Sequence, residues 1–242
     1  MSADTSRGTL SGVSAYLLWG VLTAYWKLLD AFDAFELIGW RVVTAVVLLL
    51  TLVAAQGKVR AVWGALRNPA MLWRVSVAAV LLAVNWTLYV WAVVNEHVIE
   101  TALGYFIAPL LTIVLGVGVL REKLRLNLKI AVVFALAGLA VLTVSYGRVP
   151  WVAISIATTW SVYGLLKKQV PLKPLESLTA EVVILAIPAL AFVAVTWNRS
   201  DSIPSTANAI EMVFALLTGV ITAAPLLLFA GASQRKIGRA HV

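Results

Sequence analysis

Residues 35–55 are FELIGWRVVTAVVLLLTLVAA, a run of 21 residues in which only Glu36 and Arg41 are charged. A helix of this length rises about 30 Å at 1.5 Å per residue, which matches the hydrocarbon core of a bilayer. The apolar residues are continuous, whereas a strand of an outer-membrane barrel alternates apolar and polar positions. The stretch therefore predicts a transmembrane helix with one cation inside it.

The rest of the sequence has the same character. Of its 242 residues, 62% are apolar and 12% are charged, whereas about 25% of the residues of an average soluble domain are charged. A soluble fold of this size needs more polar residues to cover its surface. The absence of cysteine excludes a disulfide framework and thiolate chemistry. The composition predicts an all-α, polytopic membrane protein.

Eight stretches are long and apolar enough to be spans, and short polar connections separate them. We place them at Leu10–Leu29, Phe35–Ala55, Met71–Val94, Thr101–Leu120, Leu128–Tyr146, Pro150–Leu166, Leu175–Trp197 and Ala209–Ser233. The connection Lys58–Leu66 has apolar residues at helical spacing between cations. It is either a short interfacial helix or a solvated loop.

The connections alternate in charge. Those that contain Lys58, Lys123 and Lys173 are rich in Lys and Arg, and those that contain Asp33 and Glu96 are acidic. Cytoplasmic loops of membrane proteins carry the excess of Lys and Arg. We therefore expect a cytoplasmic N-terminus, and the regular alternation supports the number of spans.

The chain also resembles itself at an offset of 140 residues. Residues 35–43 (FELIGWRVV) align with residues 175–183 (LESLTAEVV). Because five spans per copy is an odd number, the second copy would enter the membrane from the opposite face, as in many secondary transporters. We predict a five-helix repeat at residues 10–146 and a second, truncated repeat at residues 150–236.

The final residues 237–242 (IGRAHV) are polar where the repeat predicts a connection to another span. They match the translation of a common sequencing-adapter oligonucleotide. We expect this tail to be non-native, although a genuine terminus is the alternative.

Two motifs carry a resemblance to a known family: ETALGYFIAPL at residues 100–110, and Asn85-Trp86 followed by Tyr89, Trp91 and Ala92. With Tyr16–Gly20, Tyr25–Lys27 and Thr222–Leu226, they resemble RarD-type proteins of the EamA family, in the drug/metabolite transporter superfamily. The resemblance implies ten helices in two inverted repeats, a location in the bacterial inner membrane and export of small molecules. Trp40 departs from the histidine that the family pattern has before Arg41.

Charged groups inside spans are expensive and usually face the bundle interior. Arg41 lies about two turns into its span, and Glu181 occupies the repeat-related position in another. One interpretation is a charged pair that lines a translocation path, with Glu181 as a proton-coupling group. The other is a structural pair, or two side chains that reach towards their own interfaces.

Asn85 and Tyr89 are four residues apart and therefore share one face of a helix. An amide and a phenol on an interior face suit a polar organic solute. The alternative is that Asn85 only joins two helices and that Tyr89 only packs.

The sequence contains no H-E-x-x-H, G-x-S-x-G or Walker A motif. It predicts no catalytic residue, no metal site, no cofactor and no nucleic-acid partner. We expect a secondary transporter that moves a small organic solute by alternating access, with Arg41, Glu181, Asn85 and Tyr89 along the path. A membrane scaffold that transports nothing is the alternative, and a membrane-embedded enzyme is more distant.

Overall fold

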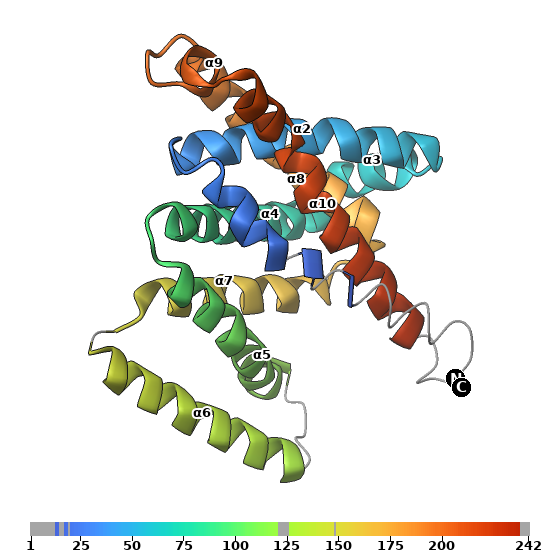
Figure 1. Cartoon of the computed structure of the whole chain (residues 1–242). Helices are drawn as coiled ribbons and strands as arrows, with labels where there is room; N and C mark the ends of the chain where they lie inside the picture. The colour runs from blue at the N-terminus through green and yellow to red at the C-terminus, as the bar shows by residue number, and fades with distance from the viewer. Residues whose placement is uncertain (1–12, 15–16, 19, 121–125, 148, 238–242) are drawn as a thin grey trace. The chain divides into compact units, whose positions relative to one another are not determined.

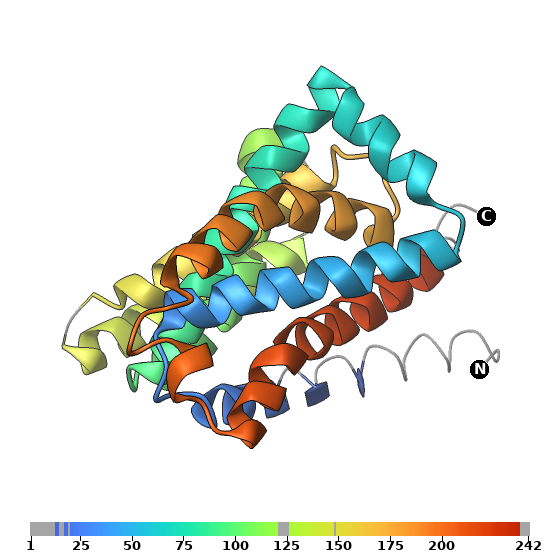
Figure 2. The same ribbon diagram turned by 90° about the horizontal axis from the view of Figure 1, so that it is seen from above.

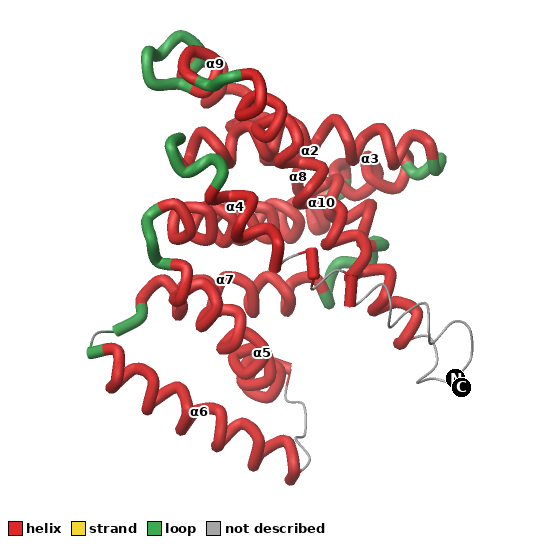
Figure 3. The backbone as a smooth tube through the Cα atoms, viewed as in Figure 1, coloured by secondary structure: helices red, strands yellow, loops and turns green. Residues whose placement is uncertain are grey.

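A computed structural model describes residues 13–14, 17–18, 20–120, 126–147 and 149–237 (Figure 1). Within these ranges the chain is helical and contains no strand, as the red and green tube of Figure 3 shows. Five of the described helices are long and apolar enough to cross a membrane. The all-α polytopic fold predicted from the sequence is therefore confirmed.

The helices follow the predicted spans closely. Their bounds are α2 Ala34–Ala55, α3 Val59–Arg67, α4 Pro69–Val94, α5 Val98–Leu120, α6 Leu126–Tyr146, α7 Trp151–Lys167, α8 Pro174–Thr196, α9 Ile203–Thr206 and α10 Ala209–Ile237. The first predicted span, Leu10–Leu29, lies partly outside the described residues. The predicted tail at residues 237–242 lies outside them except for Ile237.

Large apolar side chains remain exposed along the helices, as expected where lipid is the solvent. Val144 is 81% exposed and Phe134 is 74% exposed, both on α6. In water such a surface would drive aggregation. In a bilayer it is the surface that contacts acyl chains.

The chain forms two compact units, and each is described here by itself. Unit 1 comprises Met1–Ala79 and Pro171–Val242, and unit 2 comprises Val80–Val170. Both units therefore contain residues from the two predicted repeats.

Helices α2, α8 and α10 form the centre of unit 1. Helix α2 packs against both α8 and α10, and Figure 2 shows α2 running beside α10. The close approach depends on Gly219, because a Cβ there would overlap the backbone of Ala45. The Gly219 N–H donates to Thr44 Oγ1 at 3.0 Å across the same contact.

The segment Lys58–Leu66, for which a helix and a loop were both open, is helix α3. It buries Val62 and Ala65 and leaves Trp63 half exposed. The helix packs against α8. This one-sided burial agrees with the interfacial interpretation.

Unit 2 is built on the contact between α5 and α7. One apolar cluster joins Ile107 and Ala108 of α5 to Ala153 and Ala157 of α7. A second cluster joins Ala92 of α4 to Val152 and Ile156 of α7. Gly104 makes the α5–α7 contact possible, because a Cβ there would lie 3.0 Å from the Ala153 carbonyl oxygen.

Candidate functional site

Arg41 lies in the buried part of α2, where it is 5% exposed. Its Cζ atom lies 5.4 Å from the ring centroid of Trp26. Trp26 is fully buried and meets Tyr25 edge-on, with ring centroids 5.6 Å apart. A guanidinium over an indole face is attracted by the ring quadrupole, and the attraction grows when water is excluded. The first span thus supplies an aromatic partner for the cation of α2.

Glu181 is fully buried in α8. Its Oε1 atom accepts a hydrogen bond from Ser177 Oγ at 3.0 Å, one helical turn away. Unit 1 therefore buries a cation on α2 and a carboxyl on α8, and these two helices pack against each other. Buried ionisable groups in spans mark ion or substrate paths more often than they serve stability.

Asn85 holds a buried amide between three helices of unit 2. Its Nδ2 atom donates to the Ile156 carbonyl at 3.1 Å and to Thr159 Oγ1 at 2.9 Å, both on α7. Its Oδ1 atom accepts from the Tyr105 hydroxyl of α5 at 3.3 Å. The amide is thus oriented by α5 and α7 rather than by its own helix.

A row of aromatic rings extends from this amide. Tyr89 meets Tyr105 at a centroid distance of 5.9 Å, Tyr105 meets Trp160 at 6.0 Å, and Trp160 meets Tyr163 at 5.7 Å. The Lys167 ammonium lies 5.3 Å from the Tyr163 ring centroid. We call Tyr89, Tyr105, Trp160 and Tyr163 the aromatic row. Such a row offers ring faces and phenol groups to a planar organic molecule.

Two hydroxyl groups lie between α5 and α7 in the same unit. Thr112 Oγ1 donates to Ser161 Oγ at 3.1 Å, and Ser161 Oγ donates to the Ala108 carbonyl at 2.9 Å. Hydroxyl groups between helices both join the helices and offer polar contacts inside a span.

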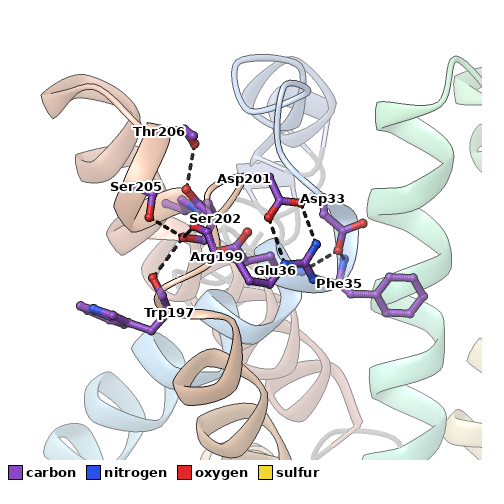
Figure 4. A network of polar contacts seen from close by, with 10 residues as sticks. Asp33, Phe35, Glu36, Trp197, Arg199, Asp201, Ser202, Ser205 and Thr206 are labelled. Atoms are coloured by element: carbon purple, nitrogen blue, oxygen red, sulfur yellow. Dashed lines mark hydrogen bonds and ion pairs between the residues drawn. The ribbon is translucent and has the colours of Figure 1, made fainter.

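A polar network in unit 1 lies where α8 leads into α10 (Figure 4). Glu36 Oε1, at the start of α2, accepts from the backbone N–H of Ile203 at 2.8 Å. Arg199 binds Asp201 through two hydrogen bonds of 3.0 and 2.6 Å. These hydrogen bonds lower the pKa of Asp201 below its ordinary value. The network ties the segment before α10 to the first turn of α2.

The sequence predicted Arg41, Glu181, Asn85 and Tyr89 as path residues. The structure places the first two in unit 1 and the last two in unit 2, all on helices. Sequence reasoning missed Trp26 as the partner of Arg41, and Thr159 and Trp160 as neighbours of the Asn85 face. Spacing along one helix cannot reveal which side chain of another helix will meet it. Across the described residues, no group of three or more His, Cys, Asp or Glu side chains is arranged to hold a metal ion.

Long apolar helices with buried charged and amide groups among them define a multi-pass membrane protein. The EamA-like transporter family model matches residues 6–144, which is more than half of the chain. The chain belongs to this family and is of the RarD type. Members of the family are transporters rather than enzymes. This assignment makes the chain a bacterial membrane transporter of the drug/metabolite type.

Named relatives cover nearly the whole chain. A protein RarD of Streptomyces exfoliatus is 38% identical over 97% of this chain and 75% of its own length. An uncharacterized transporter of Vibrio cholerae is 35% identical over 96% of this chain and 77% of its own. A chloramphenicol-sensitive protein RarD of Pseudomonas aeruginosa is 28% identical over 82% of this chain and 67% of its own. No solved structure matches the chain.

Proposed function

We propose that this transporter exports a small organic solute by alternating access, driven by an ion or solute gradient. Arg41, Glu181, Asn85 and Tyr89 contact the solute or the coupling ion along its path. The family assignment supports transport, and the buried charged and amide groups support these four residues. The sequence has no Walker A motif, which favours secondary transport over ATP-driven transport.

The proposal rests above all on Asn85 beside the aromatic row. An amide held by α5 and α7 and next to the partly exposed ring of Tyr105 suits a solute with an aromatic ring and hydrogen-bonding groups. The relative from Pseudomonas aeruginosa is named chloramphenicol-sensitive. Chloramphenicol is such a molecule, which makes it a suitable first probe.

We further propose that residues 10–146 and 150–236 are inverted repeats, that residues 237–242 are a non-native tail, and that the N-terminus is cytoplasmic. Two repeat-related carboxylates support the repeat. Glu36 accepts from the Ile203 N–H at 2.8 Å, and Glu176 accepts from the Lys173 N–H at 3.1 Å. Both are the third residue of their helices, as an offset of 140 requires, although Glu176 caps its own helix and Glu36 binds a distant segment.

Flux of radiolabelled chloramphenicol from proteoliposomes that contain the chain tests the transport proposal. We expect Tyr89→Ala to slow efflux by up to about tenfold, because loss of an aromatic pair costs up to about 1.5 kcal/mol and about 1.4 kcal/mol is tenfold. Tyr89→Phe keeps the ring and should stay within about twofold. Phe134→Ala, which removes an exposed ring from α6, is the matched control and should match the unmodified chain.

Folded protein that moves no chloramphenicol and no other aromatic solute would contradict the proposal. That result would favour the scaffold alternative. If Tyr89→Ala and Phe134→Ala slowed efflux equally, the aromatic row would have no specific role in transport.

A further inference from the structure

The turn between α4 and α5 contains an acid–base pair that is separate from the four proposed path residues. His97 precedes α5, and its Nδ1 atom lies 3.0 Å from Glu100 Oε1 in the first turn of that helix. Glu96, just before it, has a positive φ of 65°, and the His97 N–H donates to the Ala92 carbonyl at 2.7 Å. The backbone of the turn thus fixes the imidazole over the start of α5.

The two partners differ sharply in exposure. The Glu100 side chain is 2% exposed, whereas the His97 side chain is 25% exposed. An imidazole is the side chain that ordinarily gains and loses a proton near neutral pH. The pair therefore joins a buried carboxyl to an imidazole that bulk water reaches.

The imidazole is also coupled to the packing of unit 2. It stacks on Trp91 of α4, with ring centroids 5.3 Å apart and planes at 15°. Trp91 meets Trp151, the first residue of α7, at 5.5 Å. Trp91 also packs on the cluster of Ala92, Val152 and Ile156. A change in the charge of His97 therefore acts on the contact between α4 and α7, which we call the α4–α7 seam.

From this geometry we propose that His97 and Glu100 form a proton-binding site that closes the α4–α7 seam when a proton binds. A proton on the imidazole changes the charge of the pair from −1 to 0. It also adds a cation to the face of the Trp91 indole, which strengthens the stack. Release of the proton leaves a buried carboxylate beside a neutral ring and weakens the seam.

Within the described residues of unit 2, three elements lie around the imidazole. Glu96 and Glu100 are on its own segment, and the first turn of α7 has no acidic residue and begins with two apolar residues. Helix α4 contributes Trp91, and the amide of Asn95, just after this helix, donates to the Trp91 carbonyl at 2.8 Å. Glu100 is the buried carboxyl 3.0 Å from the ring, and Glu96, an exposed carboxyl on the same turn, provides the comparison.

Coupling of this site to export rests on the proposed function, whereas the proton-dependent closure can be measured without a substrate. The chain has no cysteine, so Val152→Cys introduces a single reporter under Trp91. Its rate of alkylation by a maleimide is measured in nanodiscs from pH about 5 to about 8. The alkylation rate of Val152→Cys in the chain with His97 is divided by the rate in the chain that also carries His97→Phe. This ratio removes the pH dependence of the thiol itself.

We expect this ratio to be about two- to fivefold lower at acidic pH than at alkaline pH, as the loss of a cation–ring contact implies. Glu100→Gln should weaken the dependence of this ratio on pH or shift it to another pH. Glu96→Gln should leave the dependence unchanged. His97→Phe keeps an aromatic stack on Trp91, so the comparison isolates the proton from packing. A ratio that does not vary with pH would overturn the proposal, as would an equal effect of Glu96→Gln and Glu100→Gln.

Chloramphenicol flux then separates the two proposals. We expect His97→Phe to abolish accumulation driven by a pH gradient and to preserve exchange without a gradient. If the unmodified chain moves no chloramphenicol while the alkylation profile remains, the transport proposal fails and the proton site stands. If His97→Phe still accumulates chloramphenicol under a pH gradient as the unmodified chain does, coupling through this site is wrong.

Discussion

At the scale of single residues, the environment of Arg41 shows what a sequence can and cannot predict. An arginine two turns into an apolar run is visible in the sequence as a group that needs a partner. The partner, Trp26, is fifteen positions earlier and on another helix. Only packing brings an indole face to within 5.4 Å of the guanidinium. The charge was predictable, and its neighbour was not.

This contact leads to a prediction for Arg41→Lys. The ammonium keeps the charge but lacks the planar guanidinium that lies over the Trp26 ring. A cation–π contact without water is worth up to about 2 kcal/mol, so chloramphenicol efflux should fall by about tenfold at normal expression. Glu181→Gln should also slow efflux, since it removes the buried carboxyl group of α8.

Arg67→Lys is the matched control, because Arg67 is exposed in the last turn of α3. It should transport as the unmodified chain does. Normal flux in both Arg41→Lys and Glu181→Gln would assign these residues a structural role and remove them from the path.

The same distinction applies to the polar face of unit 2. Helical spacing put Asn85 and Tyr89 on one face, and the structure places both near Tyr105. Thr159 and Trp160 complete the surroundings from α7, more than seventy positions away. No spacing rule within one span contains that information. The tyrosine of the GYFI motif was in view as a family feature, but its contact with Asn85 required the fold.

At the scale of helices, the sequence predicted which segments are helical better than it predicted where each helix begins and ends. Each predicted span from residue 35 onward is a helix in the structure. The observed starts differ from the predicted ones by up to three residues. Helix α5, for example, begins at Val98 rather than at Thr101, because its first turn contains Glu100, which an apolar window excludes. Asn68 Oδ1 accepts from the Ala70 N–H at 3.0 Å and so starts α4 two residues before the predicted span. The four-residue helix α9 escaped prediction because it is too short to show a period.

The crossing of α2 and α10 allows a stability prediction. Gly219→Ala places a Cβ against the backbone of Ala45 and against Thr44, and neither can move without shifting a helix. Overpacking of this kind costs about 1–3 kcal/mol of the free energy of unfolding. The measurement is unfolding in detergent micelles, followed by circular dichroism.

Gly164→Ala provides the comparison within a helix. A Cβ at Gly164 meets open space, so the substitution should be neutral or stabilise by up to about 1 kcal/mol. If Gly219→Ala were as stable as Gly164→Ala, the close approach of α2 and α10 would be incorrect.

At the scale of the whole molecule, charge in the connections and contacts within each unit agree on sidedness. The acidic connection that contains Asp33, before α2, is predicted to be external, and the alternation of the spans puts the connection between α8 and α10 on the same side. Glu36 and Ile203, one from each region, share a hydrogen bond in unit 1. In unit 2, His97 and Trp151 both contact Trp91, and their connections were also predicted to be on one side. These contacts support the alternation of spans but leave its absolute direction to experiment.

That direction is predicted by the excess of Lys and Arg on one set of connections. Because the chain has no cysteine, single substitutions can be labelled without background. In intact cells a membrane-impermeant maleimide should label Glu96→Cys and Asp201→Cys. It should label Lys58→Cys and Lys173→Cys only after permeabilisation. External labelling of Lys58→Cys, with Glu96→Cys protected, would contradict the predicted orientation. The N-terminus would then lie outside the cell.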